Sequence, residues 1–353
     1  MDLKTKKSIL PPKHNHYIFI RIKLFLVAVW AGKISARKLW NVFVCSLAYI
    51  FKTKYSARAP IVLSLELWNE CNAGCLFCRD AKGRIYNINP EYPDIDSISK
   101  GKMSPEMAKD IIGQLKEDVL IAVLYTNGEP LLYPDLADVV KFSTANKVMT
   151  MISTNGLLFT EDNARHLLEA GIDLIKIQLG GFTQDIYSIQ VRYGDVEKLK
   201  NNIRKLVRLK EELKSHAVIL IDWMTYNYNR HQIPLIRRFC KELGLMVSFR
   251  QGNPRGGLED KETPLPVETL SMSCDWLWKG MQVDFNGNVL PCCDGVIWAN
   301  IKPYSVYITG TSKVKEIWNG PAAQATREFM RTKGRRGMSI CKQCQRTGIA
   351  FKW

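Results

Sequence analysis

The chain has 353 residues, of which 46% are hydrophobic and 24% charged, and its formal net charge is +16 at pH 7. This composition excludes a disordered chain, and the length favours one large domain with an appendage. The ten cysteines are clustered, and the early apolar stretch is interrupted by Arg21 and Lys23 and has no signal-peptide cleavage pattern. We therefore expect a cytoplasmic protein whose cysteines hold metal rather than form disulfides.

Residues 1–58 form a basic and apolar segment. They contain twelve Lys and Arg residues against Asp2 alone, which gives +11 and leaves +5 for the rest of the chain. Two apolar stretches, 17–32 and 39–51, are helix-length pieces without the roughly 18 uninterrupted apolar residues of a membrane span. One hypothesis is peripheral contact with anionic lipid at the inner membrane surface, and the other is a pair of packed helices with solvated lysines. No nucleic-acid reading module accompanies the charge, so no nucleic acid is expected as a partner.

From about residue 60, strand and helix patterns alternate. Val, Ile and Leu runs predict six strands, and helical spacing predicts five helices between them. The strands are expected at 61–67, 119–126, 148–156, 173–181, 217–226 and 245–252, and the helices at 103–117, 134–146, 160–171, 196–214 and 231–244. Strands this apolar indicate a parallel sheet buried on both faces. The sequence thus predicts an α/β fold, with a partial (β/α)6 barrel over residues 59–252 and polar groups at the C-terminal strand ends.

Three cysteines follow the first expected strand in CNAGCLFC, residues 71–78. A four-iron cubane needs one outside ligand for each iron, so Cys71, Cys75 and Cys78 would leave one iron open. The alternative is a zinc loop completed by a distant ligand, which the position after a βα strand disfavours. The spacing resembles the signature of the radical S-adenosylmethionine (SAM) enzymes. That resemblance implies that the open iron binds SAM and that an electron from the cluster releases a 5′-deoxyadenosyl radical, which removes hydrogen from an unactivated carbon.

TNGEP, residues 126–130, follows the second expected strand and looks like the family's Gly-Gly-Glu-Pro element. The resemblance implies that Asn127, Gly128, Glu129 and Pro130 bind SAM, with Glu129 and backbone carbonyls receiving the ammonium group. Gly128 would keep this approach free of a Cβ atom. Asn127 replaces the first glycine and tolerates the left-handed conformations of a tight turn.

Three later positions extend the resemblance. STNG, residues 153–156, matches the family's ribose-binding position through Ser153 and Asn155. QLGG, residues 178–181, departs from the usual Ser-x-Asp-Gly, but Gln178 can still hydrogen-bond a ribose. RYGD, residues 192–195, resembles the turn in which an arginine, here Arg192, pairs with the SAM carboxylate. The alternative for Arg192 is a solvated side chain at a helix start.

Residues 253–353 begin with a linker rich in Gly, Pro and charge and are expected to form a small separate domain. A hairpin is expected at 284–292, with Asn286 and Gly287 in its turn. The spacing Gly287-x4-Cys292 resembles the SPASM auxiliary-cluster domains, and the chain looks like their shortened form, called twitch, with one auxiliary cluster. The resemblance implies that this cluster has all four irons filled, so that it serves electron transfer or structure. The expected ligands are Cys274, Cys292, Cys341 and Cys344, with a tetrahedral zinc site as the alternative.

Cys293 has two interpretations. It can replace Cys292 as a ligand, or, on an extended segment, it can point to the opposite face and donate a hydrogen atom to a substrate radical. Cys240 and Cys45 lie in apolar helices and are expected to be core residues.

The resemblance covers residues 61–353 and implies two 4Fe-4S clusters, SAM and an external electron donor such as flavodoxin or ferredoxin. Relatives with one auxiliary cluster include dehydrogenases and epimerases of aminoglycosides and cyclitols. We therefore expect hydrogen abstraction from a sugar- or cyclitol-type carbinol carbon and oxidation to a ketone, on a small molecule that carries phosphate or a lipid. The alternatives are an epimerase with Cys293 as hydrogen donor and a radical SAM peptide maturase.

Overall fold

The computed structural model describes residues 15–79, 82–85, 98–252, 274–292, 294–295, 301–342 and 344. Cys293, for which the sequence suggested a catalytic role, lies outside these residues, as does the expected linker at 252–269 after its first residue.

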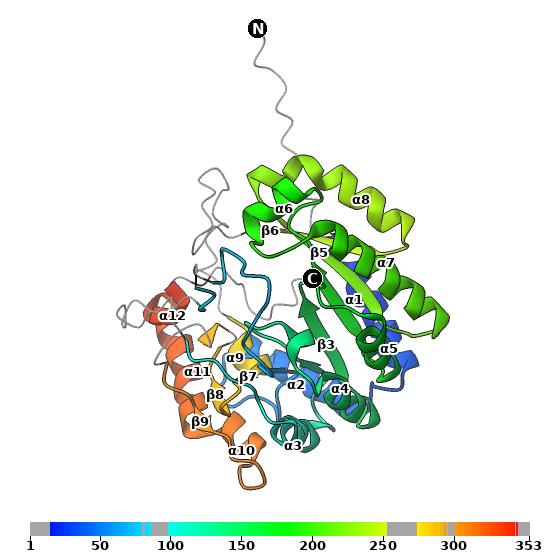
Figure 1. The fold of residues 1–353 in the computed structure, drawn as a ribbon. Helices are drawn as coiled ribbons and strands as arrows, with labels where there is room; N and C mark the ends of the chain where they lie inside the picture. The colour runs from blue at the N-terminus through cyan, green and yellow to red at the C-terminus, as the bar shows by residue number, and fades with distance from the viewer. Residues whose placement is uncertain are drawn as a thin grey trace.

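One mixed sheet organises the molecule, with the strand order β6-β5-β4-β3-β2-β1-β7-β8-β9 (Figure 1). The first six strands run parallel in chain order, as a partial (β/α)6 barrel requires. The expected barrel is confirmed, and each strand falls inside its expected range. The strands are β1 (Val62–Leu65), β2 (Ile121–Val123), β3 (Met149–Thr154), β4 (Leu174–Gln178), β5 (Val218–Thr225) and β6 (Met246–Gln251).

Helices cover one face of the barrel sheet, and their apolar stripes form the main core with it. Ser104 and Thr160 cap two of them, accepting hydrogen bonds from the backbone amides of Met107 and Asn163. The helices are α3 (Pro105–Leu115), α4 (Leu136–Ala145), α5 (Glu161–Glu169), α6 (Gln184–Gln190), α7 (Val196–Glu212) and α8 (Ile233–Glu242), with the 3-10 turns η1 (Pro130–Leu132) and η2 (Asn227–Gln232). The helix α6 was not expected, because its short segment carries no strong helical pattern in the sequence.

The C-terminal unit continues the barrel sheet. β7 (Gly280–Val283) pairs parallel with β1, and β8 (Asn288–Leu290) and β9 (Ser305–Val306) follow antiparallel. The expected hairpin turn is present, with Gly287 at a φ of 84° that favours glycine. Helices α9 (Trp276–Lys279), α10 (Val314–Trp318), α11 (Pro321–Lys333) and α12 (Ser339–Lys342), with η4 (Arg335–Gly337), complete the unit. The division into 1–58, 59–252 and 253–353 stays a prediction, but β7 joins the last two parts through one sheet.

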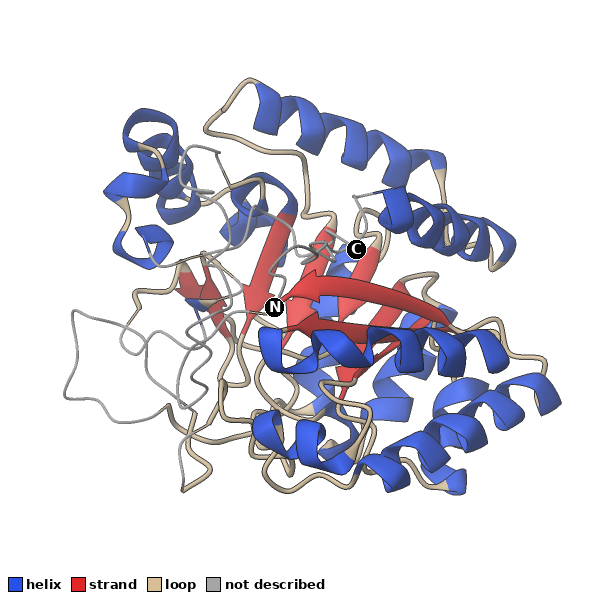
Figure 2. Ribbon diagram, turned by 90° about the horizontal axis from the view of Figure 1, so that it is seen from above, coloured by secondary structure: helices blue, strands red, loops and turns tan. Residues whose placement is uncertain are grey.

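The N-terminal segment forms two helices, α1 (Asn15–Trp30) and α2 (Ala36–Ile50), which pack on the other face of the sheet. Figure 2 shows helices on both faces of the sheet. Ile20, Leu24, Ala28 and Cys45 pack there against inward-facing strand residues such as Leu220. Packed helices were one of the two hypotheses, and for this side of the helices that hypothesis is confirmed. Within the described ranges, no helix has the length and apolar content needed to cross a membrane.

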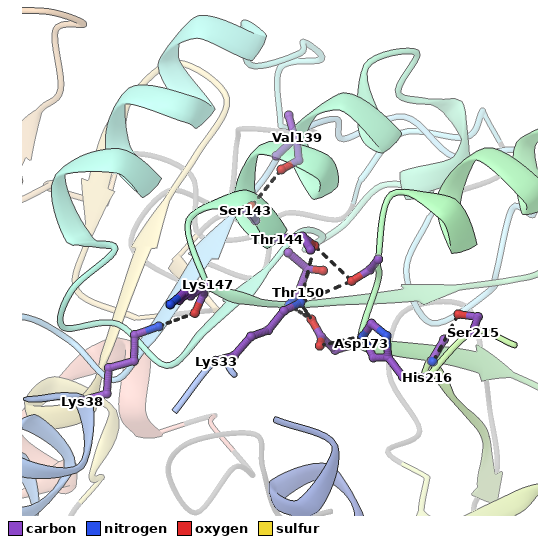
Figure 3. A network of polar contacts seen from close by, with 12 residues as sticks. Lys33, Lys38, Val139, Ser143, Thr144, Lys147, Thr150, Asp173, Ser215 and His216 are labelled. Carbon is purple, nitrogen blue, oxygen red and sulfur yellow. Dashed lines mark hydrogen bonds and ion pairs between the residues drawn. The ribbon is translucent and has the colours of Figure 1, made fainter. Parts of the chain in front are cut away.

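Two lysines of this segment are buried, although the packed-helix hypothesis had them solvated. The Nζ of Lys33 lies 2.7 Å from a carboxylate oxygen of Asp173, and Lys38 donates to the backbone carbonyl of Lys147 (Figure 3). The backbone amide of Thr150 also donates to Asp173, at 2.8 Å. These contacts fasten the helical pair to β3 and to the start of β4.

Candidate active site

The three-cysteine loop follows β1, at the C-terminal ends of the parallel strands. Cys75 forms an antiparallel bridge with Val191. The backbone amide of Tyr193 donates to the carbonyl of Ala73 at 3.1 Å. The segment between α6 and α7 therefore holds the loop, and it brings the half-buried Arg192 beside it.

Apolar side chains fasten the same loop to the far part of the barrel. Leu76 and Phe77 lie between the first and third cysteines and pack with Met224 and Tyr226 at the end of β5. The loop thus reaches from the first strand toward the fifth, along the edge where the parallel strands end.

Arg79, directly after Cys78, connects the loop to its neighbours. This guanidinium is 1% exposed, and its Nη2 donates to the backbone carbonyls of Asn69 at 2.6 Å and Asn127 at 3.0 Å. Its Nη1 donates to the carbonyl of Gly83 at 3.0 Å. Arg79 was not expected at the site, because its only signal in the sequence is a basic residue next to the third cysteine.

Glu129 joins the turns after β2 and β3. Its carboxylate accepts hydrogen bonds from the Thr154 hydroxyl at 2.5 Å, the Asn155 amide at 2.8 Å and the Leu131 amide at 3.0 Å. Burial raises the pKa of Glu129 to about 7, although these three bonds favour the charged form. The structure gives Glu129 a positioning role, and its contact with the SAM ammonium group stays a prediction.

Gly128 is required by the fold itself. A Cβ atom at this position would lie 1.9 Å from the carbonyl oxygen of Trp68, so no side chain fits between the two turns. The expected reason was the approach of SAM, whereas the close approach seen is that of the β1 loop. Pro130 begins the 3-10 turn η1.

The side chain of Asn155 connects the turn after β3 to the cysteine loop. Its Nδ2 lies 3.8 Å from the Sγ of Cys71 and donates to the Oδ1 of Asn72 at 2.9 Å. Ser153, two residues earlier, is buried, and its register partner on β4 is Lys176. Gln178 ends β4, half-buried, with Asp222 of β5 as its register partner. The structure therefore gathers all the residues expected at the SAM site around one edge of the sheet.

A buried charged cluster lies beside Gln178. Asp222, whose side chain is 1% exposed, lies 3.1 Å from the Nζ of Lys176 and 2.8 Å from the Nη2 of Arg250. The hydroxyl of Ser248 donates to it at 2.9 Å. Burial disfavours the charged carboxylate, but Arg250 and Lys176 hold the pKa of Asp222 at about 2. Two cations around one anion leave excess positive charge inside the barrel. The cluster was not expected from the sequence, because the strands looked uniformly apolar.

Buried polar groups also line the seam between β1 and β7. Glu66 is 2% exposed and accepts a hydrogen bond from Asn127 at 3.4 Å. Burial raises the pKa of Glu66 to about 8, and the charge of Asp284 adds to the rise. Gln282 donates to the hydroxyl of Thr126 at 3.2 Å, but its buried Oε1 has no partner among the described residues. A buried acceptor without a partner suits a ligand hydroxyl.

The four expected cysteines of the C-terminal unit all lie among the described residues, half-buried. Cys341 and Cys292 pack against one small apolar cluster, and Cys341 and Cys274 pack against another. The amide of Asp294 donates to the Sγ of Cys292 at 3.3 Å, and the Sγ of Cys344 donates to the Asp294 carboxylate at 3.7 Å. Shared apolar neighbours and Asp294 connect these cysteines, and their role as one ligand set stays a prediction.

Arg335 completes this second site and was not foreseen. It is 1% exposed, and its Nη2 donates to the carbonyl of Cys344 at 2.8 Å. Burial raises the pKa of Cys341, and the neighbouring Arg335 opposes that rise. A buried cation beside these thiols would stabilise their thiolate forms, which are the metal-binding forms.

Family models match both parts of the chain. The radical SAM superfamily model matches residues 65–234, and the SPASM iron-sulfur cluster-binding domain matches residues 274–345. The chain belongs to the radical SAM superfamily. Its C-terminal unit is a SPASM domain, so the resemblance to both families is confirmed, whereas the shortened twitch form stays a prediction.

Individual relatives are distant. The radical SAM chain is 24% identical over 188 residues to a probable GTP 3′,8-cyclase of Methanocaldococcus jannaschii, covering 53% of this chain and 57% of that protein. It is 30% identical over 128 residues to the mycofactocin maturase MftC of Mycobacterium tuberculosis, covering 36% and 29%. The crystal structure of Streptococcus suis SuiB bound to precursor peptide SuiA has a TM-score of 0.61 at 14% identity, covering 83% and 72%. The chain spans less than two thirds of these curated relatives, and the structural likeness shows the fold alone.

Radical SAM enzymes with a SPASM domain use SAM, a SAM-binding 4Fe-4S cluster and auxiliary clusters, and the residues present fit that requirement. Three half-buried thiols lie on one short loop. Burial raises the pKa values of Cys71 and Cys75, and the charge of a bound metal would favour their thiolate forms. Among the described residues, no three His, Cys, Asp or Glu side chains converge as ligands of one metal ion. A cubane makes no such demand, because each thiolate binds a different iron.

Proposed function

We propose that this radical SAM enzyme oxidises a carbinol carbon of a sugar- or cyclitol-type small molecule to a ketone. The substrate must lose a hydrogen atom from carbon, then a proton from its hydroxyl group and one further electron, so two electrons leave in total. Hydrogen abstraction is the chemistry that SAM and the first cluster supply when bound. Acceptance of the second electron is the chemistry that one closed cluster of the twitch type would supply on the four C-terminal cysteines.

The proposal assigns the first site in two parts. Cys71, Cys75 and Cys78 would hold the SAM-binding cluster. SAM itself would contact the turns after β2, β3 and β4 and the segment after α6, through Asn127, Gly128, Glu129, Pro130, Ser153, Asn155, Gln178 and Arg192. Their position along one edge of the sheet supports this assignment.

The proposed substrate class rests on one observation, the charged cluster of Lys176, Asp222 and Arg250. Its positive excess lies next to Gln178, and the Arg250 side chain is 40% exposed, so its guanidinium can reach a bound molecule. An arginine beside a lysine suits a phosphate or carboxylate. The unpartnered Oε1 of Gln282 supports a hydroxyl-bearing ligand. A small polyol that carries phosphate, free or lipid-linked, has both features.

A peptide maturase is the second candidate, because MftC is a maturase and SuiB was crystallised with a precursor peptide. An epimerase acting on the same small molecules is the third, with Cys293 as hydrogen donor. The proposal also includes an external electron donor such as flavodoxin or ferredoxin and a cytoplasmic location, peripheral at the inner membrane surface, with no nucleic-acid partner.

Deuterium transfer distinguishes the substrate classes. Extract from native host cells grown on deuterated carbon would be separated into anionic small molecules, lipids and peptides, and each fraction given to the anaerobically reconstituted enzyme with SAM. We expect deuterium in 5′-deoxyadenosine from the small-molecule or lipid fraction, and less after phosphatase treatment. The Arg250→Gln variant should transfer less, and Arg238→Gln, on the exposed side of α8, should match the wild type. Transfer from the peptide fraction alone, abolished by protease, would support the maturase instead.

A further inference from the structure

The solvent side of α1 and α2 is unusually apolar. Among the described residues, twelve of the eighteen exposed large hydrophobic side chains lie between residues 19 and 55. We define the outer face by Phe19, Ile22, Leu26 and Trp30 of α1 and Trp40 and Phe43 of α2. Trp30 is 77% exposed and Trp40 is 66% exposed. Exposed apolar groups gathered in this way mark an interaction surface on an otherwise folded protein.

Helical spacing makes the outer face continuous along each helix. Phe19, Ile22, Leu26 and Trp30 recur three or four residues apart, as neighbours on one side of α1 do. The buried stripe that packs on the sheet, represented by Leu24, lies on the other side. Both sides of α1 are therefore apolar, and the sheet buries only one of them.

The positive charge of the helical pair favours an anionic partner. The sequence from residue 15 to residue 58 contains no Asp or Glu. Arg21, Lys23, Lys54 and Arg58 are all exposed. A second copy of this chain would bring the same positive charges together, whereas an anionic lipid surface would neutralise them.

The helical pair is firmly held. Lys33, in the turn between α1 and α2, donates to Asp173 at 2.7 Å and to the carbonyl of Gly171 at 3.3 Å (Figure 3). Lys38 at the start of α2 donates to the carbonyl of Lys147. These two lysines serve the fold, so the outer face is presented by a fixed pair of helices.

We propose that the outer face docks on an anionic lipid bilayer, with α1 and α2 lying in the interface. At 16 residues α1 is about 24 Å long, too short for the hydrocarbon core, which is about 30 Å thick. Aromatic and aliphatic side chains would enter the acyl boundary while lysines and arginines meet the headgroups. The residues of the outer face would make the peripheral membrane contact, whichever reaction the enzyme catalyses.

Vesicle flotation of the full reconstituted protein tests this. We expect binding to vesicles of phosphatidylglycerol in phosphatidylcholine, weaker binding in high salt, and little binding to phosphatidylcholine alone. Arg21→Gln with Lys23→Gln should lower the binding constant about thirtyfold, at about 1 kcal/mol for each charge. Trp30→Ala with Trp40→Ala should lower it about tenfold or more, because both rings are exposed in the free protein.

Matched controls separate docking from damage to the fold. Ile308→Ala with Phe329→Ala removes exposed apolar groups elsewhere, and Lys205→Gln with Lys241→Gln removes exposed charges on α7 and α8. Both pairs should bind vesicles like the wild type, and all variants should keep wild-type iron content and circular dichroism. The proposal is overturned if anionic vesicles bind no protein, or if the outer-face variants bind as well as the controls. It is also overturned if the tryptophan pair instead dissolves a lipid-free dimer seen by ultracentrifugation.

Discussion

Arg79 donates a hydrogen bond to the backbone carbonyl of Asn127 at 3.0 Å, which ties the cysteine loop to the turn after β2. The same guanidinium holds the carbonyls of Asn69 and Gly83. One buried side chain thus fixes the position of two segments that the proposed function places around SAM.

Replacing Arg79 by lysine should loosen this arrangement. A lysine keeps the charge but cannot reach three carbonyls with a planar fork, and each lost bond from a charged donor costs about 1.5–3 kcal/mol. We expect Arg79→Lys to incorporate less iron at the first site and to produce less 5′-deoxyadenosine. Arg238→Lys is the control, and equal iron and activity in the two variants would contradict a structural role for Arg79.

The two cysteine sets should lose iron independently. Reconstituted wild-type protein should hold about eight irons, four for each of two clusters. Changing Cys71, Cys75 and Cys78 to Ala should halve the iron and abolish SAM cleavage, as measured by iron assay and chromatography of 5′-deoxyadenosine.

Changing the C-terminal set should have the opposite pattern. With Cys274, Cys292, Cys341 and Cys344 replaced by Ala, iron should again halve, but SAM cleavage without substrate should persist. Cleavage by the first variant, or full iron in the second, would refute the assignment of the two clusters. About twelve irons in the wild type would show a full SPASM domain with two auxiliary clusters.

Glu66 should make stability fall as pH rises. The folded-state pKa of Glu66 is about 8, above its usual 4.5, so the folded chain keeps a proton that the unfolded chain releases. Between pH 6 and pH 8 the wild type should therefore lose about 2 kcal/mol of unfolding free energy relative to Glu66→Gln, which keeps the acceptor for Asn127. Anaerobic denaturant titrations at the two pH values measure the difference. Glu242→Gln, on the exposed side of α8, should behave like the wild type; a Glu66→Gln variant with wild-type pH dependence would show that Glu66 is not the group responsible.

Much of the fold was predictable because its signals are local. Strands buried on both faces give continuous Val, Ile and Leu runs. Ser104 and Thr160 are capping residues, which mark the start of a helix in the sequence. The position of β7 beside β1 was not predictable, since strand order depends on contacts between residues far apart in the chain. The short segment of α6 also carried no periodic pattern strong enough to predict a helix.

The candidate site shows the same division. Cysteine spacing and the turns at Asn127 and Asn155 are sequence motifs, and the structure brings them together. Lys176, Asp222 and Arg250 come from three different strands, so their meeting becomes visible only in the sheet register. The motif of Glu129 predicts a SAM contact, which stays a prediction, and only the structure shows that its carboxylate also positions two turns.

Cys293 gives the test that separates oxidation from epimerisation. If the substrate radical regains hydrogen from this thiol, Cys293→Ala should stop formation of the epimer while SAM cleavage and deuterium transfer to 5′-deoxyadenosine continue. The oxidation proposed here predicts unchanged turnover and product, measured by mass spectrometry with Cys240→Ala, a buried core change, as the control. Loss of an epimer in Cys293→Ala would sink the dehydrogenase proposal.

Carbonyl formation tests the oxidation itself most directly. The active fraction would be incubated with enzyme and SAM and then treated with borodeuteride, and the deuterium fixed in the small molecule compared with the 5′-deoxyadenosine formed. A dehydrogenase gives one ketone for each SAM cleaved productively, so we predict equal amounts of the two. A product that takes up no deuterium from borodeuteride but carries a solvent-derived hydrogen at the attacked carbon would contradict the account.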